Sequence, residues 1–236
     1  MNINLSIVIP AYKENKNIKN LINLIYKEIN ISLKNFEVII VDDNSNDGIK
    51  DTCAKFKKKF SNLNLFVRKK SKRDLAKSCI DGFNLSKFKN ILVMDADLQH
   101  HPKYINKMIA EFTKHDLDML VACRKFENKS KVGVSYLRYI LSRFIIFLFN
   151  FFLGFRTKDP MSGFFIFKKK IFYSNKDRLF ARGYKILADL IYNSKDKLKI
   201  RDIFIDFPQR LFDKSKMNSK VLILICIFFI KKYFIK

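Results

Sequence analysis

The feature that most constrains this chain is a regular alternation of short apolar segments and longer amphipathic ones. Runs rich in β-branched and aromatic residues predict strands at 5–9, 36–41, 63–67, 90–94 and 118–123. Between the first four strands, apolar residues at helical spacing predict helices at 17–29, 49–60 and 75–85. A strand, a helix and another strand imply a parallel crossover. We therefore expect an α/β fold with a doubly wound, Rossmann-like, mostly parallel sheet.

Polar clusters follow three of the expected strands, at Tyr12–Glu14, Asp42–Asp47 and Asp95–Gln99. In a doubly wound sheet, ligands bind beyond the carboxyl ends of the strands, where the loops leave the core. The three clusters are therefore expected to face one edge of the sheet and to form one binding site.

The strongest local signal is the pair Asp95 and Asp97 at the end of an apolar strand. Strand geometry would place carboxylates at this spacing on one side. Two close carboxylates repel each other unless a cation lies between them, and hard oxygen ligands suit Mg²⁺ or Mn²⁺. Gln99 could add a neutral oxygen. A solvated turn after the strand is the alternative, because Asp is common there.

Several enzyme classes lack their expected motifs in this chain. There is no G-x-G-x-x-G or G-x-x-x-x-G-K-[ST] sequence, which argues against a dinucleotide-dependent dehydrogenase and a P-loop NTPase. There is no G-x-S-x-G elbow, and only three histidines, so hydrolase and His-based metal sites are disfavoured. A bound diphosphate would have to be held by a metal ion and arginines.

The charge balance favours an anionic partner. The chain carries 47 Lys and Arg against 22 Asp and Glu, a formal net charge of +25. Nucleic acid, anionic lipid head groups and phosphorylated substrates would all be attracted, although an AT-rich genome could also explain much of the excess. We expect no nucleic-acid partner, because no recognised nucleic-acid-binding motif is present.

Cysteine usage and the N-terminal residues indicate the compartment. The four cysteines form no C-x-x-C pair, and residues 1–5 do not resemble a secretory signal. We therefore expect a protein of the reducing cytoplasm.

The second half of the chain has a different character. Residues 134–155 form a long apolar and aromatic stretch interrupted by Arg138, Ser142 and Arg143, which predicts helices lying on a membrane. Residues 221–230 are apolar and precede two lysines. Because a bilayer span needs about 20 apolar residues, this tail is expected to be an interfacial anchor. We expect a domain at 1–218, with a donor half at about 1–125, interface helices at about 134–156 and an acceptor-side section at about 157–218. A membrane-associating tail follows at 219–236.

The order of motifs resembles the family-2 inverting glycosyltransferases of GT-A fold, and within them the dolichyl or polyprenyl phosphate mannose synthases. The resemblance runs from about residue 5 to residue 217. In the donor half it rests on Leu5-Ser-Ile-Val-Ile-Pro10-Ala-Tyr12-Lys-Glu14-Asn, Val41-Asp42-Asp43-Asn-Ser-Asn-Asp47-Gly48 and Met94-Asp95-Ala-Asp97-Leu-Gln99. Further along it rests on Val121-Ala-Cys-Arg124, Asp159-Pro-Met-Ser-Gly163-Phe, Arg182-Gly183-Tyr184 and Phe207-Pro-Gln-Arg210-Leu-Phe-Asp-Lys-Ser215-Lys216.

The resemblance implies a role for particular residues of this chain. Those that would hold the nucleoside are Pro10, Tyr12, Glu14, Val41 and Asp43. Those that would hold metal and diphosphate are Asp95, Ala96, Asp97 and Gln99. Those that would surround the phosphates are Arg124, Arg210 and Lys216. Arg138 and Ser142 fall where the family meets the acceptor phosphate. Asp97, Arg210 and Asp189 are the expected catalytic residues.

This chain also departs from the family pattern, chiefly on the acceptor side. The family's glycine-rich R-x-x-G-L-G segment is replaced by Arg73-Asp74-Leu75-Ala76. Phe165 stands where an Arg often follows Gly-Phe, and Leu187 with Asp189 replaces the usual Gln and Glu. Phe212 takes the place of a glycine.

The resemblance implies transfer of mannose from GDP-mannose to a polyprenyl or dolichyl phosphate, with Mg²⁺ or Mn²⁺. The enzyme would act at the cytoplasmic face of the membrane, as a peripheral or interfacially anchored protein. A phosphate acceptor is already ionised near neutral pH, whereas a hydroxyl acceptor would need a base, for which Asp189 or Asp159 is the candidate. The alternatives are a UDP-sugar transferase acting on a glycan or lipopolysaccharide precursor, and an inert homologue that binds a lipid or a protein partner.

Overall fold

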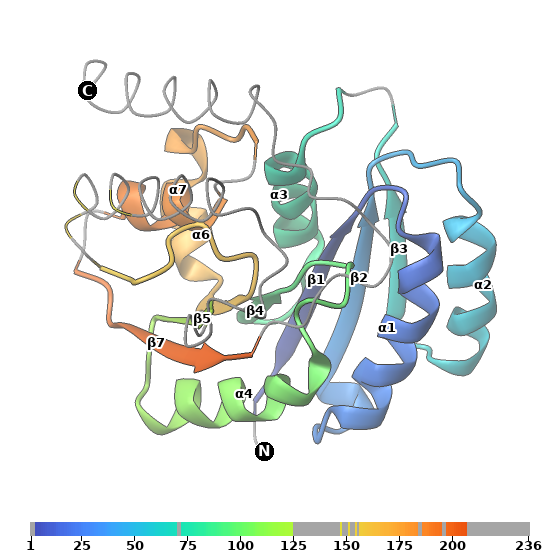
Figure 1. Cartoon of the computed structure of the whole chain (residues 1–236), viewed down its shortest axis with the longest axis horizontal. Helices are drawn as coiled ribbons and strands as arrows, with labels where there is room; N and C mark the ends of the chain where they lie inside the picture. Colours follow the sequence, from blue (N-terminus) through green and yellow to red (C-terminus); the bar gives the residue numbers. More distant parts are fainter. Residues whose placement is uncertain are drawn as a thin grey trace, which may run out of the picture.

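The computed structural model describes residues 3–69, 72–124, 147, 151, 154, 156–183, 186–194 and 197–206. Most of the expected interface helices and the whole expected tail lie outside these residues. The predicted site residues that also lie outside them are Arg138, Ser142, Arg210 and Lys216. In the part of the chain that is described, one twisted sheet lies between two layers of helices (Figure 1).

The sheet contains seven strands in the order β3-β2-β1-β4-β6-β5-β7. Their bounds are β1 Leu5–Ala11, β2 Phe36–Asp42, β3 Leu63–Val67, β4 Asn90–Val93, β5 Met119–Arg124, β6 Phe165–Lys168 and β7 Ile200–Ile205. Strand β6 runs antiparallel to β4 and β5, and every other pair is parallel. The prediction of a mostly parallel, doubly wound sheet is confirmed.

Helices cover both faces of the sheet. One face packs against α1 (Asn15–Glu28), α2 (Ile49–Lys59) and α4 (Ile105–Lys114). The other packs against α3 (Leu75–Leu85), α6 (Lys170–Asn175) and α7 (Ile186–Asn193). The described residues also include three short 3₁₀ helices, η1 (Leu33–Asn35), η2 (Pro102–Tyr104) and η3 (Lys176–Arg178). None of the helices in these described segments combines the length and the apolar character that crossing a bilayer requires.

Helix α4 is an element that the sequence analysis left unassigned. Its buried residues are Ile105, Met108, Ile109 and Phe112, which have the i, i+3, i+4, i+7 spacing of an amphipathic helix. The signal was therefore present in the sequence, between the expected strands at 90–94 and 118–123.

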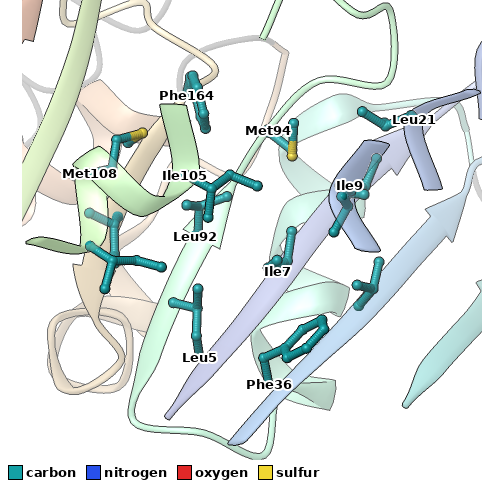
Figure 2. Packing of buried hydrophobic residues seen from close by; sticks show 14 of the residues in the cluster. Leu5, Ile7, Ile9, Leu21, Phe36, Leu92, Met94, Ile105, Met108 and Phe164 are labelled. Atoms are coloured by element: carbon teal, nitrogen blue, oxygen red, sulfur yellow. The ribbon is translucent and has the colours of Figure 1, made fainter. Parts of the chain in front are cut away.

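The core follows from alternation along the central strands. Leu5, Ile7 and Ile9 of β1 point to the face that α1 and α4 cover (Figure 2), whereas Val8 points to the α3 face. All four side chains are fully buried, and each such burial contributes about 1.5–3 kcal/mol. Helix α3 approaches the sheet closely at Gly82, where a Cβ would lie 2.3 Å from Cγ1 of Val8.

Candidate active site

The polar loops gather at one edge because the strands that precede them share a direction. The carboxyl ends of β1, β2, β3, β4, β5 and β7 meet at this edge, and antiparallel β6 begins there. Residues 12–14 follow β1, residues 43–47 follow β2, and residues 94–101 follow β4, so the prediction that the three clusters share an edge is confirmed. The strand order reverses between β1 and β4, which is the point where doubly wound sheets bind ligands.

The loop after β1 is tied to the loop after β2. The main-chain N–H of Lys13, which has a left-handed φ of 58°, donates to Oγ of Ser45 at 2.7 Å. Beside it, the guanidinium of Arg73 lies 3.9 Å from the ring centroid of Tyr12. The buried Glu14 accepts a hydrogen bond from Nδ2 of Asn17 at 2.7 Å. Tyr12 thus contacts a residue from a distant loop, whereas Glu14 is held by the first turn of α1.

The two adjacent aspartates after β2 have different roles. Asp42 is fully buried and accepts hydrogen bonds from the N–H and the hydroxyl of Ser45, which closes a capped turn. Asp43 faces the loops after β3, where it accepts from Nη1 of Arg68 at 2.5 Å and from the N–H of Asp74 at 2.7 Å. Each carboxylate oxygen has a second lone pair, so Asp43 can still accept a hydrogen bond from a nucleoside.

Arg68 is a site-forming residue that the sequence analysis did not single out. Its side chain and that of Asp43 are each 5% exposed, and its Nε donates to Asp81 at 2.7 Å. The available signal was weak, since Arg68 is one basic residue after an expected strand in a chain rich in Lys and Arg.

Asp95 and Asp97 lie in a turn, and the expectation that strand geometry aligns them is wrong. Strand β4 ends at Val93, so both carboxylates belong to the loop that follows. The N–H of Asp95 donates to Nδ1 of His100 at 2.9 Å instead of joining the sheet ladder. Leu98 has a φ of 63°, and the N–H of Gln99 donates to Oδ1 of Asp97 at 3.1 Å. Local hydrogen bonds therefore set the geometry of this pair.

His100 is a second residue whose role only the structure reveals. It is 4% exposed, and its ring stacks on Phe164 with 5.1 Å between centroids. Its Nδ1 accepts the hydrogen bond from the N–H of Asp95, which ties the ring to the backbone of the turn. From the sequence, the few histidines argued only against hydrolase and His-based metal sites, and no role was predicted for His100. In the structure, His100 holds the backbone at Asp95.

The segment Asp159–Gly163 enters the edge just before β6. Oγ of Ser162 donates to the carbonyl of Ala122 in β5 at 2.7 Å, which fixes the segment in place. A Cβ on Gly163 would lie 2.7 Å from Oδ2 of Asp95, closer than real Cβ atoms approach another heavy atom. Only glycine fits beside the Asp95 carboxylate without displacing it.

Arg124 and Asp159 lie near each other at this edge. Arg124 is the last residue of β5 and is half-buried. Burial raises the pKa of Asp159 to about 6, although the positive charge of Arg124 and a hydrogen bond from the N–H of Met161 act in the opposite direction. Asp202 of β7 accepts hydrogen bonds from Oγ1 of Thr157 at 2.6 Å and from the N–H of Lys158 at 2.8 Å, and so holds the chain leading to Asp159.

Two of the departures from the family pattern are explained by burial. Phe165 is fully buried in β6 and packs against Phe167, so it is a core residue. Asp189 is 2% exposed, and its carboxylate accepts from the N–H of Ala181 at 3.0 Å and from Nδ2 of Asn193 at 2.8 Å. The described geometry gives Asp189 a role in holding residue 181, and its catalytic role stays a prediction.

Comparison with known proteins identifies the family. Residues 6–175, well over half of the chain, match the family described as Glycosyl transferase family 2. The chain belongs to this family. Two curated relatives are dolichol-phosphate mannosyltransferases. That of Mycosarcoma maydis is 30% identical over 92% of this chain and 74% of its own length, and that of Saccharomyces cerevisiae is 30% identical over 94% and 84%.

A solved structure supports the fold. Glucosyl-3-phosphoglycerate synthase from Mycobacterium tuberculosis, in complex with Mn²⁺, UDP-glucose and phosphoglyceric acid, superposes with a TM-score of 0.74. The superposition covers 98% of this chain and 80% of that one at 15% sequence identity. At this identity the match shows the GT-A fold alone, and it confirms the fold class predicted from the sequence.

The turn after β4 of this glycosyltransferase suits a divalent cation. The side chain of Asp95 is 34% exposed, whereas Asp97 is only 8% exposed and is held by the N–H of Gln99. Within residues 3–206 as far as they are described, no three His, Cys, Asp or Glu side chains gather as in an all-protein metal centre. Two carboxylates and an amide oxygen match the preference of Mg²⁺ and Mn²⁺, which leave other positions to water and phosphate oxygens. The donor set fits such an ion.

Proposed function

We propose that this glycosyltransferase transfers mannose from GDP-mannose to a dolichyl or polyprenyl phosphate. The observation that carries the proposal is the arrangement of Tyr12, Asp43 and Asp95 on the ends of three adjacent strands, β1, β2 and β4. The two dolichol-phosphate mannosyltransferases that match more than nine tenths of the chain support the choice of sugar and acceptor.

The donor would lie along the edge from β2 to β4. Those residues that would contact its nucleoside are Pro10, Tyr12, Glu14, Val41 and Asp43; Pro10 and Val41 are paired across β1 and β2. Asp95, Ala96, Asp97 and Gln99 would hold a divalent cation and the diphosphate. When bound, Mg²⁺ or Mn²⁺ would neutralise negative charge on the leaving diphosphate.

The chain's own residues would complete the reaction. Arg124 would add positive charge near the phosphates, and Arg210 and Lys216 would join it from outside the described residues. The acceptor oxygen would attack the anomeric carbon on the side opposite the diphosphate and invert its configuration. Because a polyprenyl phosphate is ionised near neutral pH, the reaction needs no strong base.

The same proposal places the enzyme at the cytoplasmic face of a membrane, as a peripheral or interfacially anchored protein. The net charge of +25 would attract anionic head groups. The apolar residues of 134–155 and 221–230, which lie largely or wholly outside the described residues, would contact the lipid, and Arg138 with Ser142 would meet the acceptor phosphate.

One observation favours a second candidate, transfer to a hydroxyl group of a glycan or lipopolysaccharide precursor from a UDP-sugar. Such an acceptor must lose a proton, and a base works best when its pKa lies near the working pH. The pKa of Asp159 is raised to about 6 at the acceptor side of the edge. Asp159 would be the base of that reaction.

The test is transfer of radiolabel from GDP-mannose, with UDP-glucose in parallel, into organic-extractable lipid by purified protein. The reaction contains polyprenyl phosphate and Mg²⁺ or Mn²⁺. We expect label from GDP-mannose in the lipid, its loss with EDTA and its loss in Asp97→Ala. The matched control is Asp51→Ala, which removes an exposed carboxylate from α2 and should leave transfer unchanged.

The other outcomes separate the alternatives. Metal-dependent donor binding without lipid label would favour a glycan acceptor, which an assay with oligosaccharide acceptors would then identify. Failure of both donors to bind would favour an inert homologue that binds a lipid or a protein partner. Full transfer by Asp97→Ala would contradict the proposed metal site.

A further inference from the structure

Asp74 occupies a position that joins two separate parts of the edge. It precedes α3 and caps that helix, because its Oδ1 accepts from the N–H of Lys77 at 3.3 Å. The same carboxylate accepts the N–H of Gly183 with both oxygens, at 3.0 and 2.9 Å. Gly183 is 109 residues away in the sequence and belongs to the segment Ala181–Gly183 before α7.

The segment Ala181–Gly183 is held at both of its ends. Besides the bond to Asp74, the carbonyl of Gly183 accepts from the N–H of Ala76 at 2.9 Å. At the other end, Asp189 accepts from the N–H of Ala181. Ala181 and Gly183 have left-handed φ values of 55° and 77°, a conformation that is costly for alanine and must be supported by such contacts.

Asp74 also contacts the expected nucleoside end directly. Its main-chain N–H donates to Oδ2 of Asp43 at 2.7 Å, and Arg68 holds the other oxygen of Asp43. Nη1 of Arg68 further reaches the carbonyl of Asp74 at 3.5 Å. The backbone of Asp74 thus helps to fix Asp43, while its side chain fixes Gly183.

We propose that Asp74 is a positioning residue that couples the order of the segment Ala181–Gly183 to the occupancy of the nucleoside end at Asp43. The coupling role rests on the proposed function, but the anchoring of Gly183 does not. In this chain the carboxylate of Asp74 supplies the anchor, and the exposed Arg182 is held between the two fixed residues.

The test uses amide hydrogen exchange of the whole protein across 181–183, first without ligand. Asp74→Ser keeps a helix cap but loses the two-oxygen contact with Gly183, so exchange there should be at least about tenfold faster. Asp74→Asn keeps one acceptor oxygen and should restore much of the protection. The matched control, Asp177→Ser, removes an exposed aspartate from η3 and should leave exchange unchanged.

The second measurement adds GDP with Mg²⁺ as the probe, and UDP with Mg²⁺ in parallel. In the unmodified protein, the nucleotide that binds should slow exchange at 181–183 severalfold. In Asp74→Ser it should bind with nearly the same Kd but no longer slow that exchange. In the transfer assay, the same variant should raise KM for the acceptor more than KM for the donor.

The outcomes keep this proposal separate from the proposed function. Unchanged exchange at 181–183 in ligand-free Asp74→Ser would overturn the anchor, whatever the enzyme's substrates. Equal slowing by nucleotide in both proteins would overturn the coupling. If neither nucleotide binds, the coupling and the proposed function both fail, while faster exchange in ligand-free Asp74→Ser would still support the anchor.

Discussion

The backbone of Gly163 lies against the carboxylate of Asp95, so that a Cβ at residue 163 would be 2.7 Å from Oδ2 and 2.9 Å from Cγ. The two residues belong to different loops, one before β6 and one after β4, which pair antiparallel. The backbone of Gly163 therefore packs directly against one side of the Asp95 carboxylate. The position of this carboxylate depends on the absence of a side chain at residue 163.

Gly163→Ala should reduce transfer much more than it reduces stability. The new methyl group would displace the Asp95 carboxylate, and a misplacement of about 1 Å can cost roughly 100-fold in rate. We expect kcat/KM to fall at least about tenfold and the Kd for Mn²⁺ in the presence of nucleotide to rise. The contrasting variant is Gly82→Ala, which clashes with Val8 in the core and should lower the midpoint of thermal unfolding. Normal metal affinity in Gly163→Ala would contradict this account.

His100→Phe should weaken metal binding at the turn after β4. Phenylalanine can still stack on Phe164, but the N–H of Asp95 loses its acceptor. We expect about a tenfold rise in the Kd for Mn²⁺, measured by calorimetry with nucleotide present. His100→Asn places an amide oxygen near the position of Nδ1 and should recover part of the affinity. If both variants bind Mn²⁺ as tightly as the unmodified protein does, the hydrogen bond has no role in positioning Asp95.

Arg68→Ala should destabilise the fold strongly, because it leaves the buried carboxylate of Asp43 without its cationic partner. Breaking a buried ion pair from one side costs about 3–5 kcal/mol. The free energy of unfolding from urea titration should show this loss. The double variant with Asp43→Asn should be more stable than Arg68→Ala alone, since no buried charge is then left unpaired. If the loss of unfolding free energy in the double variant equals the sum of the losses in Arg68→Ala and Asp43→Asn, the two side chains are not coupled.

Asp159 should make stability fall as pH rises from about 4 to about 6. Its pKa is raised from 3.8 to about 6 in the folded protein, so in this range the folded state binds more protons than the unfolded state. The contribution is therefore fully present below pH 3.8 and lost by the time the pH passes 6. Asparagine does not titrate, so Asp159→Asn should lose this pH-dependent contribution. The stability of the variant relative to the unmodified protein should therefore increase by at most about 3 kcal/mol as the pH rises through this range.

The check is urea unfolding of both proteins at several pH values between 3.5 and 7. The difference between the two proteins isolates Asp159, because the other titrating groups are common to both. A difference that does not change with pH would mean that the carboxyl of Asp159 is not shifted.

The sequence predicted the strand ends well because each depends on local pattern. Short β-branched runs bounded by polar residues marked β1 to β5 to within about two residues. The same logic located Tyr12, Asp43 and Asp95 at one edge, since parallel strands end together. The prediction was wrong where strand geometry was applied to residues beyond the end of a strand. Strand geometry was expected to align the carboxylates of Asp95 and Asp97, although β4 ends before both residues.

Other parts of the site could not be predicted from local pattern. Arg68 and Asp74 gain their roles from partners that are far away in the sequence. His100 bonds to Asp95 only five residues before it, but the pattern of apolar residues does not specify the turn that brings the two together. Asp43 lies 25 residues from Arg68, and Gly183 lies 109 residues from Asp74. Polar residues of these types are usually found on the surface, so nothing in the local sequence distinguishes these three from solvated side chains.

The sequence by itself determined the α/β alternation, the family pattern and the edge at which the polar loops meet. These follow from the periodicity of apolar residues, which fixes which face of each element is buried. Only the tertiary structure decided which buried charge is paired, which N–H the carboxylate of Asp74 holds, and why a side chain at residue 163 would displace the carboxylate of Asp95. Those outcomes depend on close approach between segments far apart in the chain, where the hydrogen-bonding needs of buried polar groups and the packing of backbone select one arrangement.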